Sequence, residues 1–154
     1  MPYQLFMFFH VGSMFLATAL AIGPATMLFL TARSGDRGSI QRLFSFATPV
    51  FRVGGAAYGL GILFGVLTAL SGRIDLSTRW LVTSYALVFL LIATNLVFER
   101  WTRRVDAAVK REDRDAQDSL QAVLRDRVGA LSLGGMVLIT LGIVFVMVVK
   151  PGVG

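Results

Sequence analysis

The chain has 154 residues, enough for one domain, and 55% of them are hydrophobic while only 16% are charged. A soluble domain usually carries about 25% charged residues, and long uncharged stretches are typical of a membrane protein instead. Cysteine is absent, which excludes disulfides, thiolate metal sites and cysteine nucleophiles. The formal net charge of +6 fits basic loops beside apolar spans, and no basic patch with interleaved aromatic residues points to nucleic acid.

Four apolar segments follow one another along the chain, at about residues 5–32, 49–72, 79–99 and 128–149. Each is near or above the roughly 20 residues that a helix needs to cross a bilayer. Residues 1–4 carry no basic side chain, so we interpret the first segment as a retained span rather than a signal peptide. The segments predict an all-α membrane protein, an up-down bundle of four transmembrane helices that forms a single domain over residues 1–154.

The connection between the first two spans predicts a turn followed by a short amphipathic helix. Four apolar residues of this helix share one face: Ile40, Leu43, Phe44 and Ala47. Such a helix can lie at the membrane surface. We then expect Pro49 in the first turn of the second span, with Thr48 as its cap.

Residues 100–127 predict a cytoplasmic helical hairpin. The third helix is expected to continue past the membrane, to turn at about residues 112–118 and to return as the fourth. Two acid-before-base pairs with i, i+4 spacing support the helix: Glu99 with Arg103, and Asp106 with Lys110. Trp80 and Trp101 fall near opposite ends of the third span, where interfacial anchors are common.

Lysine and arginine set the expected orientation. Twelve of them lie on the side that holds the first and third loops, and three lie on the other side. Because cytoplasmic loops carry the excess of positive charge, we expect both termini outside and the two large loops in the cytoplasm.

Small residues recur at four-residue spacing in three spans. They are Ser13, Ala17 and Ala21 in the first span, Gly55 with Gly59 and Ala57, Gly61 and Gly65 in the second, and Ala130 with Gly134 in the fourth. Such stripes let membrane helices approach closely. The expected partners are the lipid bilayer, the neighbouring helices, and either other membrane subunits or further copies of the chain.

The single histidine, His10, lies about five residues into the first span, roughly 7–8 Å below its outer end. Met7 and Met14 share its helix face by spacing. Met147 and Tyr85 fall in the outer half of later spans. Imidazole and thioether groups suit copper or haem iron, with Met7, His10 and Met14 as metal ligands or Met147 opposite His10 on haem.

Two other roles for His10 remain open. With Tyr85 it is compatible with a quinone or another small ligand, and without any ligand it is a packed polar residue satisfied by one hydrogen bond. No carboxylate lies deep in a span and no second histidine exists, so a proton relay or a catalytic triad lacks its parts. We therefore expect a protein that is not an enzyme, and the alternative function is an accessory subunit of a larger respiratory or photosynthetic membrane complex.

The stretches "FHVGSMFLATALAIGPATMLFLTARSGD", "GGAAYGLGILFGVLTA" and "LSTRWLVTSYAL" resemble a family of bacterial four-helix integral membrane proteins of unknown function, similar to the CopD-type copper-resistance membrane domain. The shared pattern is His10 with Gly12 shortly after it, a glycine-rich second span and Trp80 opening the third. The resemblance implies a multi-pass protein of the bacterial cytoplasmic (inner) membrane. It also implies a link to copper handling or to haem-related chemistry, with His10 as a ligand or as a site that handles a proton.

Overall fold

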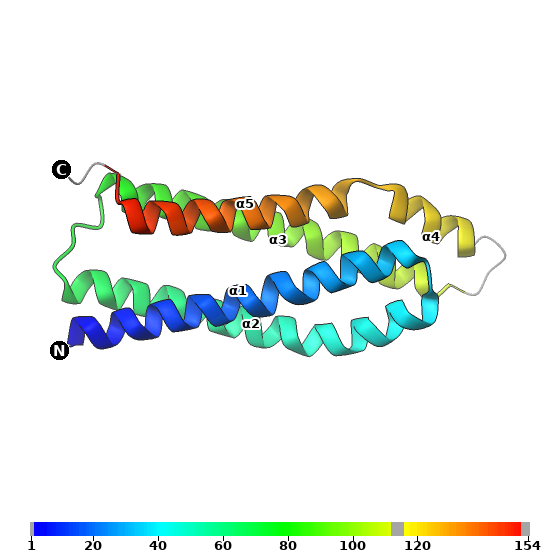
Figure 1. The fold of residues 1–154 in the computed structure, drawn as a ribbon, viewed down its shortest axis with the longest axis horizontal. Coiled ribbons are helices and arrows are strands. Elements are labelled where there is room, and N and C mark those ends of the chain that lie inside the picture. The colour runs from blue at the N-terminus through cyan, green and yellow to red at the C-terminus, as the bar shows by residue number, and fades with distance from the viewer. Residues whose placement is uncertain (1, 112–115, 152–154) are drawn as a thin grey trace.

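The computed structural model describes residues 2–111 and 116–151, and within them the chain is helical, with no strand. The helices are α1 (Pro2–Ser34), α2 (Arg37–Ser71), α3 (Arg79–Val109), α4 (Ala116–Arg125) and α5 (Val128–Val149). In this part of the chain four segments are helical, long and apolar enough to cross a membrane. They are α1, α2, α3 and the stretch Asp118–Val149, which contains α5. α1 begins and α5 ends at the end that carries the α2–α3 connection, and α4 lies at the opposite end (Figure 1).

The first two helices form a tightly closed antiparallel pair. Gly35 ends α1 with a φ of 71°, a left-handed conformation that glycine adopts without strain. Asp36 then caps α2: its carboxylate oxygens accept hydrogen bonds from the backbone amides of Gly38 and Ser39, both at 3.2 Å. The turn between the helices therefore needs only two residues.

α2 differs from the sequence expectation because it is one continuous helix from Arg37. The separate amphipathic helix and the cap at Thr48 were wrong: the Thr48 hydroxyl donates to the carbonyl of Phe44, 2.9 Å away and one turn back. Pro49 lies inside the helix, where it removes one backbone donor. The Asp36 cap satisfies the amides at the true N-terminus, twelve residues before Thr48.

α3 and α5 form the second antiparallel pair. Trp101 is 2% exposed, and its indole donates to the carbonyl of Val123 at 3.4 Å. A Cβ added to Gly129 would lie 2.6 Å from the Trp101 ring, so the indole fits there because residue 129 has no side chain. Trp80 is also buried, against Leu81 and Val146. Both rings lie near the ends of the apolar stretch, as expected, but they pack against protein rather than lie at the lipid surface.

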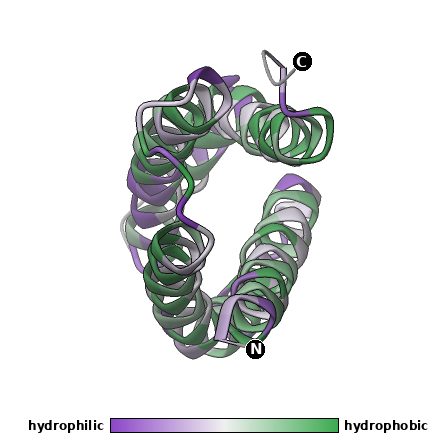
Figure 2. Cartoon of the chain, turned by 90° about the vertical axis from the view of Figure 1, so that its left-hand side faces the viewer, coloured by the Kyte–Doolittle hydropathy of each residue, from purple (hydrophilic) through white to green (hydrophobic). Residues whose placement is uncertain are grey.

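The two helix pairs join mainly at the end that carries α4. One buried cluster there draws on every helix, with Ala32 of α1, Ile40 of α2, Trp101 of α3, Leu120 of α4 and Met136 of α5 among its members. The buried cluster at the other end contains residues of α3 and α5 only. Most residues of the long helices are hydrophobic (Figure 2), and many large apolar side chains on them are exposed, among them Phe15, Leu63 and Phe89.

α3 runs without a break to Val109, so it continues past the length of the apolar span as the sequence indicates. The two i, i+4 ion pairs are confirmed, with Arg103 bound to Glu99 at 2.6 Å and Lys110 to Asp106 at 2.7 Å. The expected turn at 112–118 falls largely on residues 112–115, which lie outside the described residues. α4 and α5 are separate helices, divided at Asp126, whose carboxylate accepts from the amide of Val128 at 3.0 Å.

Candidate functional site

His10 lies in the seam between α1 and α2. Its Nδ1 is 2.7 Å from the carbonyl oxygen of Gly61. A carbonyl only accepts hydrogen bonds, so Nδ1 carries the proton and donates it. The ring also lies over Gly65, where an added Cβ would come within 2.9 Å of Cε1 and Nδ1. The glycines of α2 therefore provide both the hydrogen-bond acceptor and the space that hold the imidazole.

Met14 lies one turn further along the same seam. A Cβ added to Gly61 would be 2.5 Å from its sulfur, so Met14 and His10 contact the same turn of α2. Met7 is 43% exposed and occurs in none of the buried clusters of the described residues. The structure thus brings His10 and Met14 together and leaves the Met7 side chain more open to the surroundings.

Tyr85 and Met147 belong to the other helix pair. Met147 packs against the buried residues of α3 and α5, including Trp80, Leu81 and Val146. Tyr85 is 47% exposed. Met147 also packs against the larger cluster that draws on all five helices. Within the described residues, the hydrogen bond of the imidazole goes to Gly61 of α2, and neither Met147 nor Tyr85 is its partner.

The hydrogen bond of His10 determines what its ring can do chemically. In the neutral tautomer with the proton on Nδ1, the lone pair is on Nε2. Histidines that bind metals usually donate their other ring N–H to a carbonyl or carboxylate in this way, which fixes the tautomer and the ring orientation. The same bond also satisfies a histidine that only packs. Among the described residues, no group of three or more histidine, aspartate or glutamate side chains is placed to hold a metal, so a metal here would depend on sulfur ligands.

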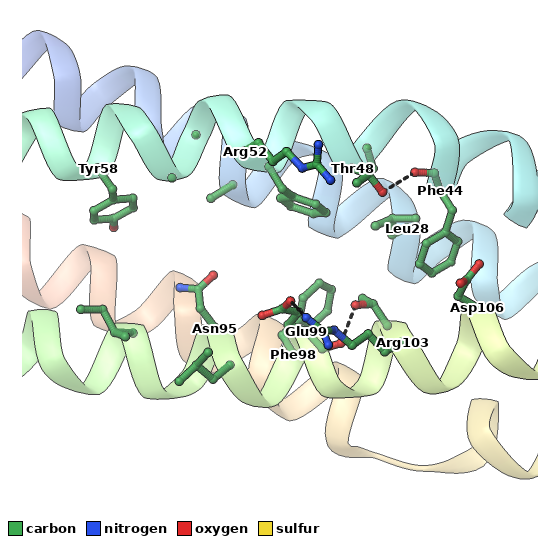
Figure 3. A pocket seen from close by; sticks show the side chains of 18 of the residues that line it. Leu28, Phe44, Thr48, Arg52, Tyr58, Asn95, Phe98, Glu99, Arg103 and Asp106 are labelled. Atoms are coloured by element: carbon green, nitrogen blue, oxygen red, sulfur yellow. Dashed lines mark hydrogen bonds and ion pairs between the residues drawn. The ribbon is translucent and has the colours of Figure 1, made fainter.

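A second feature, which the sequence did not reveal, is a groove of about 680 Å³ between the two helix pairs. It runs mainly between α2 and α3 in the half of the molecule that carries α4 (Figure 3). Apolar side chains such as Leu28, Phe51 and Leu91 line part of it. Its polar side chains are Thr48, Arg52, Tyr58, Asn95, Glu99, Thr102, Arg103 and Asp106.

Asn95 and Tyr58 point into the groove from opposite helices (Figure 3). The Asn95 amide nitrogen donates to the carbonyl of Leu91 at 3.0 Å, which leaves the amide oxygen as an acceptor. Asn95 is the only asparagine in the chain, and between Ala86 and Phe98 its only polar neighbour is Thr94. That isolation was the available signal in the sequence, since polar groups inside spans commonly mark functional sites.

Comparisons with known proteins give no match to this chain among protein-family models, curated proteins or solved structures.

Proposed function

We propose that the chain is a four-span protein of the bacterial cytoplasmic membrane that binds a metal through His10, without being an enzyme itself. The observation that carries the proposal is the hydrogen bond from Nδ1 to the Gly61 carbonyl. It holds the ring by one nitrogen and leaves the Nε2 lone pair as a ligand. The four long apolar helices support insertion in a membrane, and the distribution of basic residues supports an outer position for His10.

Copper(I) suits the available ligands better than haem does. Imidazole and thioether groups are preferred by Cu(I), and Met14 contacts the same turn of α2 as His10. A haem with two ligands from this chain would need Met147 or another group opposite His10, and a haem with one would rely on His10 alone. Met147 packs in the other helix pair. The proposal is therefore a site on α1 with His10 and Met14 as ligands and Met7 as the third.

The test is a metal analysis and an absorption spectrum of the detergent-purified chain, after incubation with Cu(I) and removal of the excess. The wild type should retain stoichiometric copper, and the variants His10→Asn and Met14→Leu should lose most of it. Asparagine keeps a donor for the Gly61 carbonyl, and leucine keeps the apolar volume of Met14. Met27→Leu is the matched control, because Met27 lies on α1 with an exposed side chain outside the seam. Copper content equal in His10→Asn and the wild type would refute the proposal.

A second candidate is an accessory subunit of a larger membrane assembly. The observation that favours it is that two glycines outside the groove are exposed: a Cβ added to Gly59 or Gly134 would meet no atom within 4 Å. Exposed small residues let another membrane helix approach closely. If Gly134 lies in such an interface, Gly134→Leu should release a co-purifying subunit or shift the mass of the detergent-solubilised particle. A wild-type chain that migrates as a monomer alone would rule this candidate out.

A further inference from the structure

The groove between the helix pairs straddles the expected boundary of the hydrocarbon layer. Nineteen residues separate Arg52 from Ser71 at the end of α2, which corresponds to about 29 Å of helix. Twenty residues separate Glu99 from Arg79 at the start of α3, or about 30 Å. The hydrocarbon core of a bilayer is about 30 Å thick. Arg52 and Glu99 therefore lie at the same level, where the core gives way to lipid headgroups.

The charges of the groove are unevenly paired. Glu99 binds Arg103 and Asp106 binds Lys110, so both acidic side chains of the lining already have a cation. Within the described part of the chain no ion pair involves Arg52. Arg52 lines the groove on the side of α2 (Figure 3). It is a guanidinium at headgroup depth, and it complements an anionic group that enters the groove.

The deeper part of the groove is mostly apolar. Toward the centre of the bilayer from Arg52, the lining consists of Ala21, Gly54 and Gly55, and then Leu91 and Ile92 from α3. Tyr58 lies about 9 Å deeper than Arg52 along α2, and Asn95 about 6 Å deeper than Glu99 along α3. Their hydroxyl and amide groups point into the groove (Figure 3) at a depth where the linkage between a headgroup and an acyl chain would pass.

We infer that the groove binds one anionic phospholipid of the inner leaflet. The guanidinium of Arg52 contacts the phosphate, because it is a planar donor suited to phosphate oxygens. Tyr58 and Asn95 contact the polar linkage, and one acyl chain lies against Leu91 and Ile92. The inference rests on the membrane insertion and orientation of the proposed function, but it is independent of His10.

The experiment is native mass spectrometry of the full chain, purified in detergent and exposed to phosphatidylglycerol or to phosphatidylcholine with the same acyl chains. The wild type should retain one phosphatidylglycerol in preference to phosphatidylcholine. Arg52→Gln should weaken that binding about tenfold, since a hydrogen bond to a charged group is typically worth such a factor. Arg100→Gln is the control, because Arg100 lies one residue from Glu99 but is not in the lining.

Two leucine substitutions, one inside the groove and one outside it, test the lipid site independently of charge. A Cβ added to Gly55 or Gly59 meets no atom within 4 Å, so both positions have open space beside the backbone for a larger side chain, and thermal unfolding of the two leucine variants checks that each folds. Gly55 lines the groove and Gly59 does not. Gly55→Leu should therefore displace the lipid, while Gly59→Leu should retain it.

Four results would overturn the inference. Equal retention of the two lipids, or retention by Arg52→Gln equal to that by Arg100→Gln, would show ordinary lipid adhering to the surface. Displacement by inorganic phosphate alone would show a site for a free anion. A change from monomer to dimer that depends on Gly55 would show that a second copy of the chain fills the groove. A chain that retains the lipid but no copper would refute the His10 proposal alone.

Discussion

The replacement Gly65→Ala tests whether the α1–α2 seam positions His10. A methyl group at Gly65 would lie 2.9 Å from Cε1 and Nδ1 of the imidazole, closer than unstrained atoms approach. The ring must move, and its Nδ1 then leaves the Gly61 carbonyl. Overpacking of this kind typically costs about 1–3 kcal/mol, and an interhelical hydrogen bond in a membrane protein contributes about 0.6 kcal/mol.

Gly59→Ala provides the matched control on the same helix. Nothing lies within 4 Å of an added Cβ there, so that variant gains only the helix propensity of alanine, about 1 kcal/mol. The same gain applies at Gly65 and cancels in the comparison. Gly65→Ala should therefore be less stable than Gly59→Ala by about 1.5–3.5 kcal/mol, measured by reversible unfolding in mixed micelles of a mild detergent and dodecyl sulfate.

A double-mutant cycle isolates the imidazole as the cause. In the background His10→Ala no ring remains for the methyl group to meet, so adding Gly65→Ala should cost no more than adding Gly59→Ala. If Gly65→Ala is as stable as Gly59→Ala in the wild-type background, the ring is not held by the seam. If Gly65→Ala lowers the free energy of unfolding by the same amount in the His10→Ala background, the strain comes from a contact other than the imidazole.

Two further predictions concern the ends of the helices. Gly129→Ala should destabilise the chain by about 1–3 kcal/mol, because the new methyl group would lie 2.6 Å from the buried ring of Trp101; Gly134→Ala, with open space around it, should not, and the same micelle unfolding compares the two. Hydrogen bonds from the side chain and the backbone amide of Ser39 hold the pKa of Asp36 below its usual value. The resulting stabilisation of the α2 N-terminus is full above the unfolded pKa, about 3.9, and is lost as the pH falls through the lower folded pKa. The protection of the Ser39 amide, which is its exchange rate relative to that of an unstructured peptide at the same pH, should fall in that acidic window and stay constant above it, and Asp36→Ala should abolish this pH dependence.

The sequence predicts the number and type of the long helices because hydropathy and length alone decide whether a segment can be a spanning helix. It does not predict which face of each helix is buried. α1 and α5 are apolar on nearly all sides over their spanning stretches, so no stripe indicates the direction of the neighbouring helix. Of the predicted glycines in the second span, Gly61 and Gly65 do face α1. Gly55 instead lines the groove between the helix pairs, and Gly59 has open space beside it.

The groove shows the same limitation over a longer range. Arg52 and Glu99 belong to different spans, and only the packing of the helices shows that both line the same groove. The start of α2 was missed for a local reason: Pro49 and Thr48 form an acceptable helix start, but Asp36 forms one earlier, and a proline is tolerated inside a membrane helix.

The claim on which the others depend is that the chain crosses the membrane four times with its basic end in the cytoplasm. Because the chain has no cysteine, single cysteines report on position without interference. Ser77→Cys lies in the α2–α3 connection and Ser34→Cys at the end of α1, and both sites are exposed. A membrane-impermeant maleimide applied to intact spheroplasts should label Ser77→Cys at once and Ser34→Cys only after the cells are opened. Labelling of Ser34→Cys in intact spheroplasts, or recovery of the chain in the soluble fraction, would contradict the claim.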